Sequence, residues 1–373
     1  MDYDFLVRPY ELNLRHQTPT GPRRLSFDRA GLSLAAWREQ ARSKLTELVC
    51  VDEHPAGGTV TELRQAVHQG VDVTALVMRV DDDLSVPGYL LRPSGVPPAS
   101  DATAVLALHG HGQVDECLGV AGVHEDYHHH FALALAQAGH TVLLPELRGF
   151  GSLHDLAAQR DGESLTYWRW GSHMAYTALT DGFQNGRTLM GDTIEDLLRW
   201  ERWLATRHGV QHVDVAGISW GGDLACTYPV FSTRVRSIFA SGTLGSFTAV
   251  FSGGGNAPAH CVPGVLGWLD RADIAGLNAP RRLAVHYGEL DVPGPDNASA
   301  SYNETVPDAY QRLHRIYAAA GAADAVSLHV SPSRGHEMDN ELLLRFLQQQ
   351  TERRRHGAQP VSERTVHGSV DDA

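Results

Sequence analysis

Residues 217–225 read GISWGGDLA, a serine with a glycine two positions away on each side. This G-x-S-x-G spacing is typical of a sharp turn between a strand and a helix that exposes a nucleophilic serine. The chain contains 37 glycines. A glycine content of this size produces the spacing by chance on the order of 0.2 times per chain. The surrounding sequence must therefore show whether the motif is a nucleophile turn or a chance match.

The sequence around the motif supplies a strand before it and a helix after it. HVDVAGI (212–218) is a continuous apolar run, as in a strand buried on both faces, and GDLACTYPVF can begin a helix. A bend between them brings Gly217 and Gly221 close together, where larger side chains would collide. It also places Ser219 at a helix N-terminus, which favours developing negative charge. We therefore predict that Ser219 is a nucleophile.

A serine hydroxyl is a weak nucleophile and needs a base, which an acid must orient. In this architecture the chain order is serine, acid, histidine. Asp291 follows the apolar run RRLAVHYG (281–288), and His336 follows the run AVSLHVS (325–331). We predict that Asp291 is the acid, with Glu289 as the alternative, and that His336 is the base.

Backbone N–H groups are also needed where negative charge develops on the substrate oxygen. Trp220, the residue after the nucleophile, should supply one of them. The loop HGHGQ (109–113) follows the apolar run TAVLALH (103–109) and should supply the other, from the N–H of His111 with Gly112 adjacent. The alternative is that HGHGQ is a plain glycine turn.

Short apolar runs alternate with helical segments through most of the chain. The expected strands are 72–80, 85–93, 103–109, 140–145, 212–218, 235–241, 281–288 and 325–331, and the expected helices are 127–139, 193–209 and 304–321. Alternation of this kind predicts an α/β fold with a mostly parallel central sheet and helices on its faces. Residues 72–93 should form an antiparallel hairpin around DDD (81–83).

The expected domain organisation has three parts: an N-terminal helical extension at 1–70, a catalytic domain at 71–350, and a polar, disordered tail at 351–373. The extension includes the segment 32–49, in which Leu34, Trp37, Ala41, Leu45 and Leu48 form one apolar stripe. Lid-like insertions are expected at about 151–186 and 242–280. Their aromatic residues are candidates for a substrate pocket or for local core: Tyr167, Trp168, Trp170, Phe247, Phe251 and Trp268.

Composition excludes several classes of partner. The formal charge is −13, which argues against nucleic acid and anionic membranes as partners, because both attract basic surfaces. No stretch has the length of a membrane span, and the N-terminus has no signal-peptide core. The four cysteines are scattered, which is consistent with a reducing, cytoplasmic location.

Two histidine-rich stretches, HGH (109–111) and HEDYHHH (124–130), raise the alternative of a metal site. Adjacent helical positions point about 100° apart, so consecutive histidines are poorly placed to share one ion. We expect no metal and no cofactor.

Several segments occur in the order expected of a known superfamily: LHGHG, PELRGFGS, GDTIEDLLRWERWL, GISWGG, LNAPRRLAVHYGELDVP and SRGHEM. On these motifs the chain resembles α/β-hydrolases over roughly residues 30–350. More narrowly, it resembles bacterial serine esterases of the acetyl-xylan-esterase and dienelactone-hydrolase-like branch. The resemblance implies a Ser219–His336–Asp291 triad, a small-molecule ester or acyl substrate and cleavage through an acyl-enzyme.

The alternative is an acyltransferase, a cyclase, or a carbon–carbon bond hydrolase or lyase that uses the same triad. A homodimer formed through the N-terminal helices is left open.

Overall fold

The computed structural model describes residues 23–95, 102–112, 114–119, 127–150, 174–252, 261–292 and 303–357. Within them, one sheet of nine strands has the order β1-β2-β3-β5-β4-β6-β7-β8-β9. The strands are β1 (Thr59–His68), β2 (Val71–Arg79), β3 (Ser85–Pro93), β4 (Thr103–Leu108), β5 (Val142–Pro145), β6 (His212–Ile218), β7 (Val235–Ser241), β8 (Arg282–Gly288) and β9 (Val326–Ser331).

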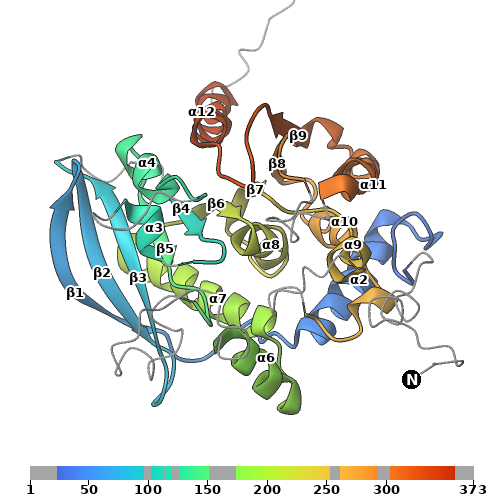
Figure 1. Cartoon of the computed structure of the whole chain (residues 1–373), viewed down its shortest axis with the longest axis horizontal. Helices are drawn as coiled ribbons and strands as arrows, with labels where there is room; N and C mark the ends of the chain where they lie inside the picture. The colour runs from blue at the N-terminus through green and yellow to red at the C-terminus, as the bar shows by residue number, and fades with distance from the viewer. Residues whose placement is uncertain are drawn as a thin grey trace, which may run out of the picture.

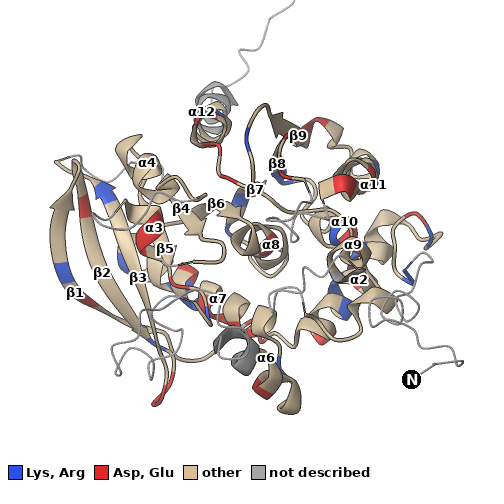
Figure 2. Ribbon diagram, in the orientation of Figure 1, with Lys and Arg blue, Asp and Glu red and all other residues tan. Residues whose placement is uncertain are grey.

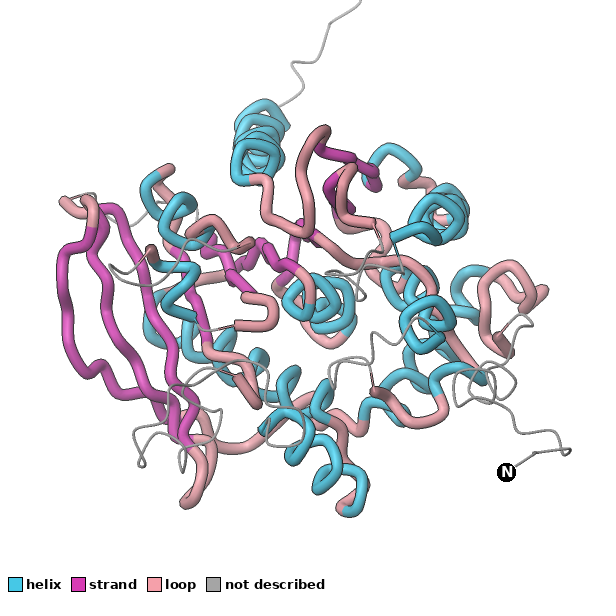
Figure 3. Tube along the Cα trace, in the orientation of Figure 1, coloured by secondary structure: helices cyan, strands magenta, loops and turns pink. Residues whose placement is uncertain are grey.

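The sheet is antiparallel at one end and parallel through the rest. β1, β2 and β3 pair antiparallel with their neighbours, and β3 pairs antiparallel with β5. From β5 onward, through β4, β6, β7, β8 and β9, every pairing is parallel. Figure 3 shows the long strands β1–β3 at one side and the short parallel strands continuing between the helices. The expected α/β architecture is confirmed, including the hairpin formed by β2 and β3.

Helices cover both faces of the parallel strands (Figure 1). One hydrophobic cluster joins Leu106 and Leu108 of β4 to helices α2, α7, α8, α10 and α11, and another joins Val105 and Ala107 to α3, α4 and α12. Successive side chains along β4 point to opposite faces of the sheet, so alternate residues belong to the two clusters. The helices are α2 (Leu34–Val49), α3 (Val114–Leu118), α4 (Phe131–Gln137), α6 (Met174–Gln184), α7 (Leu189–His208), α8 (Trp220–Thr227), α9 (Phe247–Ser252), α10 (Arg271–Gly276), α11 (Val306–Ala319) and α12 (Asn340–Gly357).

Helix α2 packs its apolar stripe onto this core. Ser33 caps the helix, and its side chain accepts a hydrogen bond from the N–H of Ala36. Trp37 is completely buried and donates its indole N–H to the carbonyl of Leu25 at 2.8 Å. Ala41 and Leu45 are also fully buried. The N-terminal helix is therefore anchored to the main body, as its periodicity predicted.

Two of the expected boundaries are corrected by the structure. Residues 59–68 were expected to belong to a helical extension, but they form β1, the edge strand of the sheet. Both faces of β1 are largely exposed, so its sequence carries no apolar alternation that would reveal it. The polar tail was expected from residue 351, whereas α12 continues to Gly357.

The lid-like insertions are described only in part. In the first insertion, residues 151–173 lie outside the described residues, and α6 forms most of the remainder. The second contains α9 and α10, with 253–260 outside the described residues.

Charged residues are interspersed along the ribbon rather than gathered on one element (Figure 2). Arg148 anchors its loop to α7, since its Nε and Nη2 donate to the two oxygens of Asp196 at 2.6 and 2.9 Å. Among the helices that the structure describes, none has the length and hydropathy needed to cross a bilayer.

Candidate active site

The turn between β6 and α8 holds Ser219 in a conformation that few side chains adopt. Its φ and ψ are 58° and −119°, and its N–H donates to the carbonyl of Ser241 at 2.9 Å. A positive φ at a non-glycine residue costs on the order of 1–3 kcal/mol and is found preferentially at functional sites. Ser219 therefore lies between a strand and a helix, in the position that the motif predicts.

The two glycines of the motif are required by close backbone contacts. A Cβ on Gly217 would lie 2.1 Å from the carbonyl oxygen of Gly221, and a Cβ on Gly221 would lie 2.0 Å from that of Leu108. Both oxygens belong to backbone and cannot move aside as a side chain can. The GISWGG spacing thus allows α8 to pack directly against the ends of β4 and β6.

Asp291 and His336 meet beyond the ends of β8 and β9. The Nδ1 atom of His336 lies 2.8 Å from Oδ2 of Asp291, whose side chain is completely buried. A carboxylate at this distance holds the imidazole proton on Nδ1 and leaves Nε2 able to accept a proton. Glu289, the alternative acid, instead accepts the N–H of Ser333 at 3.0 Å.

The end of β7 connects the serine turn to this pair. Ser241, the last residue of β7, accepts the N–H of Ser219, and Gly242 follows it. A Cβ on Gly242 would lie 2.7 Å from Cε1 of His336. The imidazole ring therefore lies directly over Gly242, beside the strand end that holds Ser219.

The HGHG loop reaches the same place from β4. A Cβ on Gly110 would lie 2.9 Å from Cβ of Ser219, so the loop runs against the nucleophile turn. The carbonyl of Gly110 lies 2.7 Å from Nδ1 of His109. Because a trans peptide points its C=O and N–H to opposite sides, this contact turns the N–H of His111 away from His109. Trp220 begins α8, which leaves its N–H at the helix N-terminus.

Of the expected pocket aromatics, the structure describes the side chains of Phe247 and Trp268. Tyr167, Trp168 and Trp170 lie outside the described residues, as does the side chain of Phe251. The ring of Trp268 is covered by Arg24 and Lys44, with the cationic groups 4.8 and 4.3 Å from the ring centre. Trp268 therefore packs beside α2. Phe247 is buried and lines an internal cavity.

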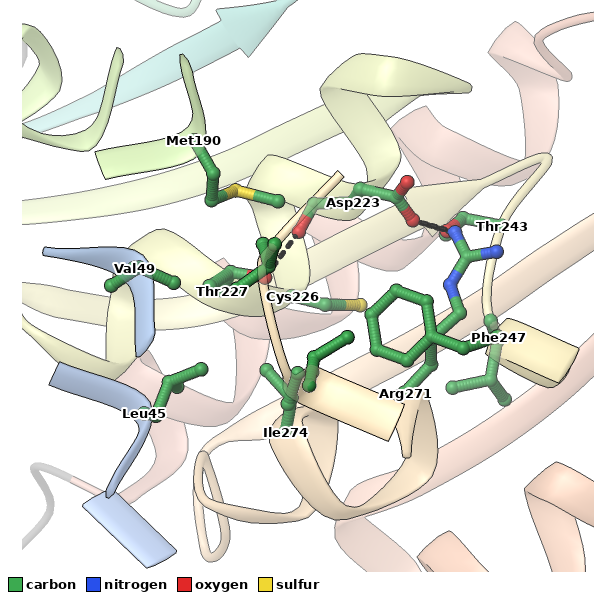
Figure 4. Close-up of a pocket in the computed structure, with 13 residues that line it drawn as sticks. Leu45, Val49, Met190, Asp223, Cys226, Thr227, Thr243, Phe247, Arg271 and Ile274 are labelled. Carbon is green, nitrogen blue, oxygen red and sulfur yellow. Dashed lines mark hydrogen bonds and ion pairs between the residues drawn. The ribbon is translucent and has the colours of Figure 1, made fainter. Parts of the chain in front are cut away.

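That cavity is enclosed largely by apolar side chains (Figure 4). Asp223, Thr243 and Arg271 form its polar end: Arg271 pairs with Asp223 and donates to the hydroxyl of Thr243 at 2.6 Å. Burial raises the pKa of the Cys226 thiol, which also lines the cavity, to about 12, so this thiol stays protonated and unreactive. The space available is about 20 Å³. It admits a single water and is too small to be an ester pocket.

The histidines that raised the alternative of a metal site make other contacts. His109 accepts the N–H of Leu147 at 3.0 Å, His128 accepts the N–H of Gly110 at 2.8 Å, and His129 lies 2.5 Å from Glu337. His124 lies outside the described residues. No three His, Cys, Asp or Glu side chains in the described parts of the chain are grouped as metal ligands.

Sequence reasoning missed the contribution of residues 127–130. The sequence predicted a helix over 127–139, but α4 begins at Phe131. His129 and His130 have φ values of 48° and 51°, which no helix accommodates, so the preceding residues form a turn. Tyr127 and His128 contact the HGHG loop from this turn. Apart from the run of histidines itself, the sequence carries no signal for these contacts.

The chain was compared with known proteins. The family model for the alpha/beta hydrolase fold matches residues 103–303, more than half of the chain. A search of curated proteins found no match.

Solved structures with the same fold include proteins named as esterases, all at low identity. A protein from Bacteroides fragilis NCTC 9343 assigned as an acetyl xylan esterase has a TM-score of 0.68 and 14% identity, over 91% of this chain and 93% of that one. A glucuronoyl esterase from Solibacter usitatus has a TM-score of 0.57 and 12% identity, over 90% and 99% of the two chains. An acetyl xylan esterase from Paenibacillus sp. R4 has a TM-score of 0.54 and 16% identity, over 92% and 99%. At these identities, the structural similarity shows a shared fold and nothing more about this chain.

Proposed function

Because the chain belongs to the alpha/beta hydrolase family, we propose that it is a serine hydrolase that cleaves carboxylic esters through Ser219, His336 and Asp291. The observation that carries the proposal is the 2.8 Å contact between His336 Nδ1 and the buried Asp291 carboxylate, with the His336 ring lying over Gly242. This arrangement gives His336 the tautomer that a general base for Ser219 requires.

In the proposed reaction, Nε2 of His336 removes the proton of the Ser219 hydroxyl, and the oxygen attacks the ester carbonyl. Asp291 stabilises the imidazolium that forms. The backbone N–H groups of His111 and Trp220 hold the negative oxygen of the tetrahedral intermediate. The alcohol then leaves with the proton from His336, and an acyl-enzyme remains. Water activated by His336 releases the acid and restores the serine. This sequence of steps needs no cofactor.

The substrate class that we propose is a small carboxylic ester. Support comes from the structurally similar proteins, which are named as acetyl xylan esterases and a glucuronoyl esterase. We further propose that the part of the chain from β1 onward carries the reaction, and that the segment before it acts through its packing on the main body. Trp37 and Leu45, which are fully buried against this body, support that division of roles.

The test is a screen of p-nitrophenyl esters from acetyl to octanoyl, with fluorophosphonate labelling of the same preparations. The wild-type chain should be labelled at Ser219 and should hydrolyse the short esters fastest. Ser219→Ala should lose both properties. Ser85→Ala, a change at an exposed serine that begins β3, is the matched control and should keep both.

Product analysis in the presence of an added alcohol separates hydrolysis from the alternative. Release of free acid supports the proposal. Transfer of the acyl group to the alcohol with no free acid would instead identify an acyltransferase. An unlabelled Ser219 in folded protein would refute the serine mechanism.

A further inference from the structure

Residues Tyr127 to His130, the turn before α4, contact the HGHG loop with two side chains. The hydroxyl of Tyr127 donates to the carbonyl of His111 at 2.6 Å, and Nε2 of His128 accepts the N–H of Gly110 at 2.8 Å. A Cβ on Gly110 would lie 2.3 Å from the Tyr127 hydroxyl, so the loop and the tyrosine are in direct contact. The two peptide groups that flank the Gly110–His111 peptide, which carries the His111 N–H, are thus held from one side.

The same turn contacts the loop that carries His336. The carbonyl of Tyr127 accepts the N–H of Met338 at 2.8 Å, and the carbonyl of His129 accepts the side-chain amide of Asn340 at 2.8 Å. The side chain of His129 lies 2.5 Å from Glu337, the residue next to His336. The rings of Tyr127 and His336 are 5.4 Å apart between centroids. The turn therefore contacts both the HGHG loop and the loop that carries His336.

The protonation state of His128 follows from its two neighbours. Since Nε2 accepts a backbone N–H, this nitrogen carries no proton. The other nitrogen, Nδ1, lies 3.5 Å from the carboxylate of Glu116 and is the one that carries the proton. The ring is completely buried. His128 is thus held as a neutral acceptor aimed at the backbone of the HGHG loop.

The backbone of the turn is unfavourable in isolation. His129 and His130 both have positive φ, a conformation that non-glycine residues avoid and that contacts with the surrounding structure must maintain. The contacts to both loops provide this support, and in return the turn fixes the distance between them.

We propose that Tyr127, His128 and His129 form a positioning turn, which sets the oxyanion-binding peptide of His111 and the imidazole of His336 relative to each other. The proposal rests on the proposed function, because it assigns these residues a role in that reaction. None of the three needs to touch the substrate. Their effect is on the placement of groups that do, so it should appear in the rate of the chemical step rather than in substrate binding.

The test compares His128→Leu, which removes the acceptor for the Gly110 N–H, with His128→Gln, whose amide oxygen can replace Nε2. Removing an oxyanion donor lowers kcat by roughly 10²–10³-fold, so displacing one through the loss of its support should lower kcat by about 100-fold in His128→Leu, with KM changed less than about threefold. His128→Gln should recover most of the rate. Tyr127→Phe, which removes one hydroxyl and keeps the ring, should lower kcat by roughly three- to tenfold.

The matched control is His130→Gln, in the same turn. The ring of His130 lies against Gly119, so this variant should keep the wild-type rate. For each variant, kcat and KM on p-nitrophenyl acetate, the rate of fluorophosphonate labelling at Ser219, and amide hydrogen exchange over 108–112 and 335–340 are measured. Faster exchange in both segments of His128→Leu and Tyr127→Phe, but not of His130→Gln, is expected.

Two results would overturn the positioning turn: labelling of His128→Leu at the wild-type rate, or equal loss of rate in His128→Gln and His128→Leu. Failure of the proposed function has a different signature, since the wild-type chain would then neither label nor hydrolyse esters. Hydrogen exchange would decide the role of the turn in that case as well. Faster exchange in both segments would support it, and unchanged exchange in either segment would refute it.

Discussion

Replacing Gly242 with alanine adds one methyl group directly beneath the ring of His336. The new Cβ would lie 2.7 Å from Cε1 and 3.1 Å from Nδ1 of that ring. Ordinary contact begins at about 3.4 Å, so the ring must move by roughly 0.7 Å or the backbone must shift. Because the hydrogen bond to Asp291 fixes Nδ1, we expect the movement to displace Nε2 relative to Ser219.

The magnitude has two parts, one catalytic and one conformational. A misplacement of about 1 Å in a reacting group can cost on the order of 10²-fold in rate, so a displacement of about 0.7 Å should lower kcat by roughly 10–100-fold. Gly242 also has a φ of 56°. Alanine in this region costs about 1–2 kcal/mol, which should appear as a lower free energy of unfolding.

A matched control separates the two parts. Gly31 has a φ of 57°, and a Cβ there would meet no atom within 4 Å. Gly31→Ala should therefore show the same loss of about 1–2 kcal/mol in urea unfolding and keep the full rate of ester hydrolysis and fluorophosphonate labelling. If Gly242→Ala folds and retains activity within twofold of Gly31→Ala, the placement of His336 over Gly242 does not matter for the reaction, and the reasoning fails.

Three further predictions follow from the same geometry. Asp291→Asn should lower kcat by on the order of 10³–10⁴-fold by releasing the imidazole tautomer, whereas Glu289→Gln, at the alternative acid, should stay within about twofold; equal losses would contradict the assignment. Burial lowers the pKa of His286 from 6.5 to about 4, so near pH 5 the unfolded chain binds a proton that the folded chain does not. The free energy of unfolding should therefore fall by about 2 kcal/mol between pH 7 and pH 5 in urea titrations. In His286→Asn the fall over the same pH range should be smaller by about that amount. Arg148→Met leaves Asp196 buried beside fewer cations and should lower the free energy of unfolding by about 2–4 kcal/mol, measured by urea at pH 7; a loss below 0.5 kcal/mol would show that the pair contributes nothing.

The sequence predicted the parallel strands accurately because they are buried on both faces. β6 and β7 begin and end where their apolar runs do. Continuous burial leaves continuous apolar sequence, and turn residues mark its limits. β1 was missed because it is an edge strand with both faces largely exposed. Such a strand needs neither a continuous apolar run nor apolar alternation, so its sequence carries no strand signal.

The candidate triad could be named from the sequence because Ser219, Asp291 and His336 each follow a recognisable apolar run, in the order serine, acid, histidine. The positioning turn was not predictable, because it depends on long-range contacts. Gly110 and His128 are far apart in the chain, and histidine gives no signal for a positive φ at 129 and 130. Periodicity therefore extended the helix α4 backward through residues that the structure uses to hold two loops.

The sheet order explains why a glycine follows β7. Ser219 leaves β6 and His336 leaves the loop after β9, and these strands are separated by β7 and β8. Adjacent strands are about 4.8 Å apart, so β6 and β9 are roughly 14 Å apart, further than an imidazole can reach from its own strand end. The loop after β9 must therefore bend back across β8, where Asp291 contacts His336, and over the end of β7. A side chain on residue 242 would occupy the path of the ring, which is why the site requires the glycine there as much as it requires those flanking Ser219.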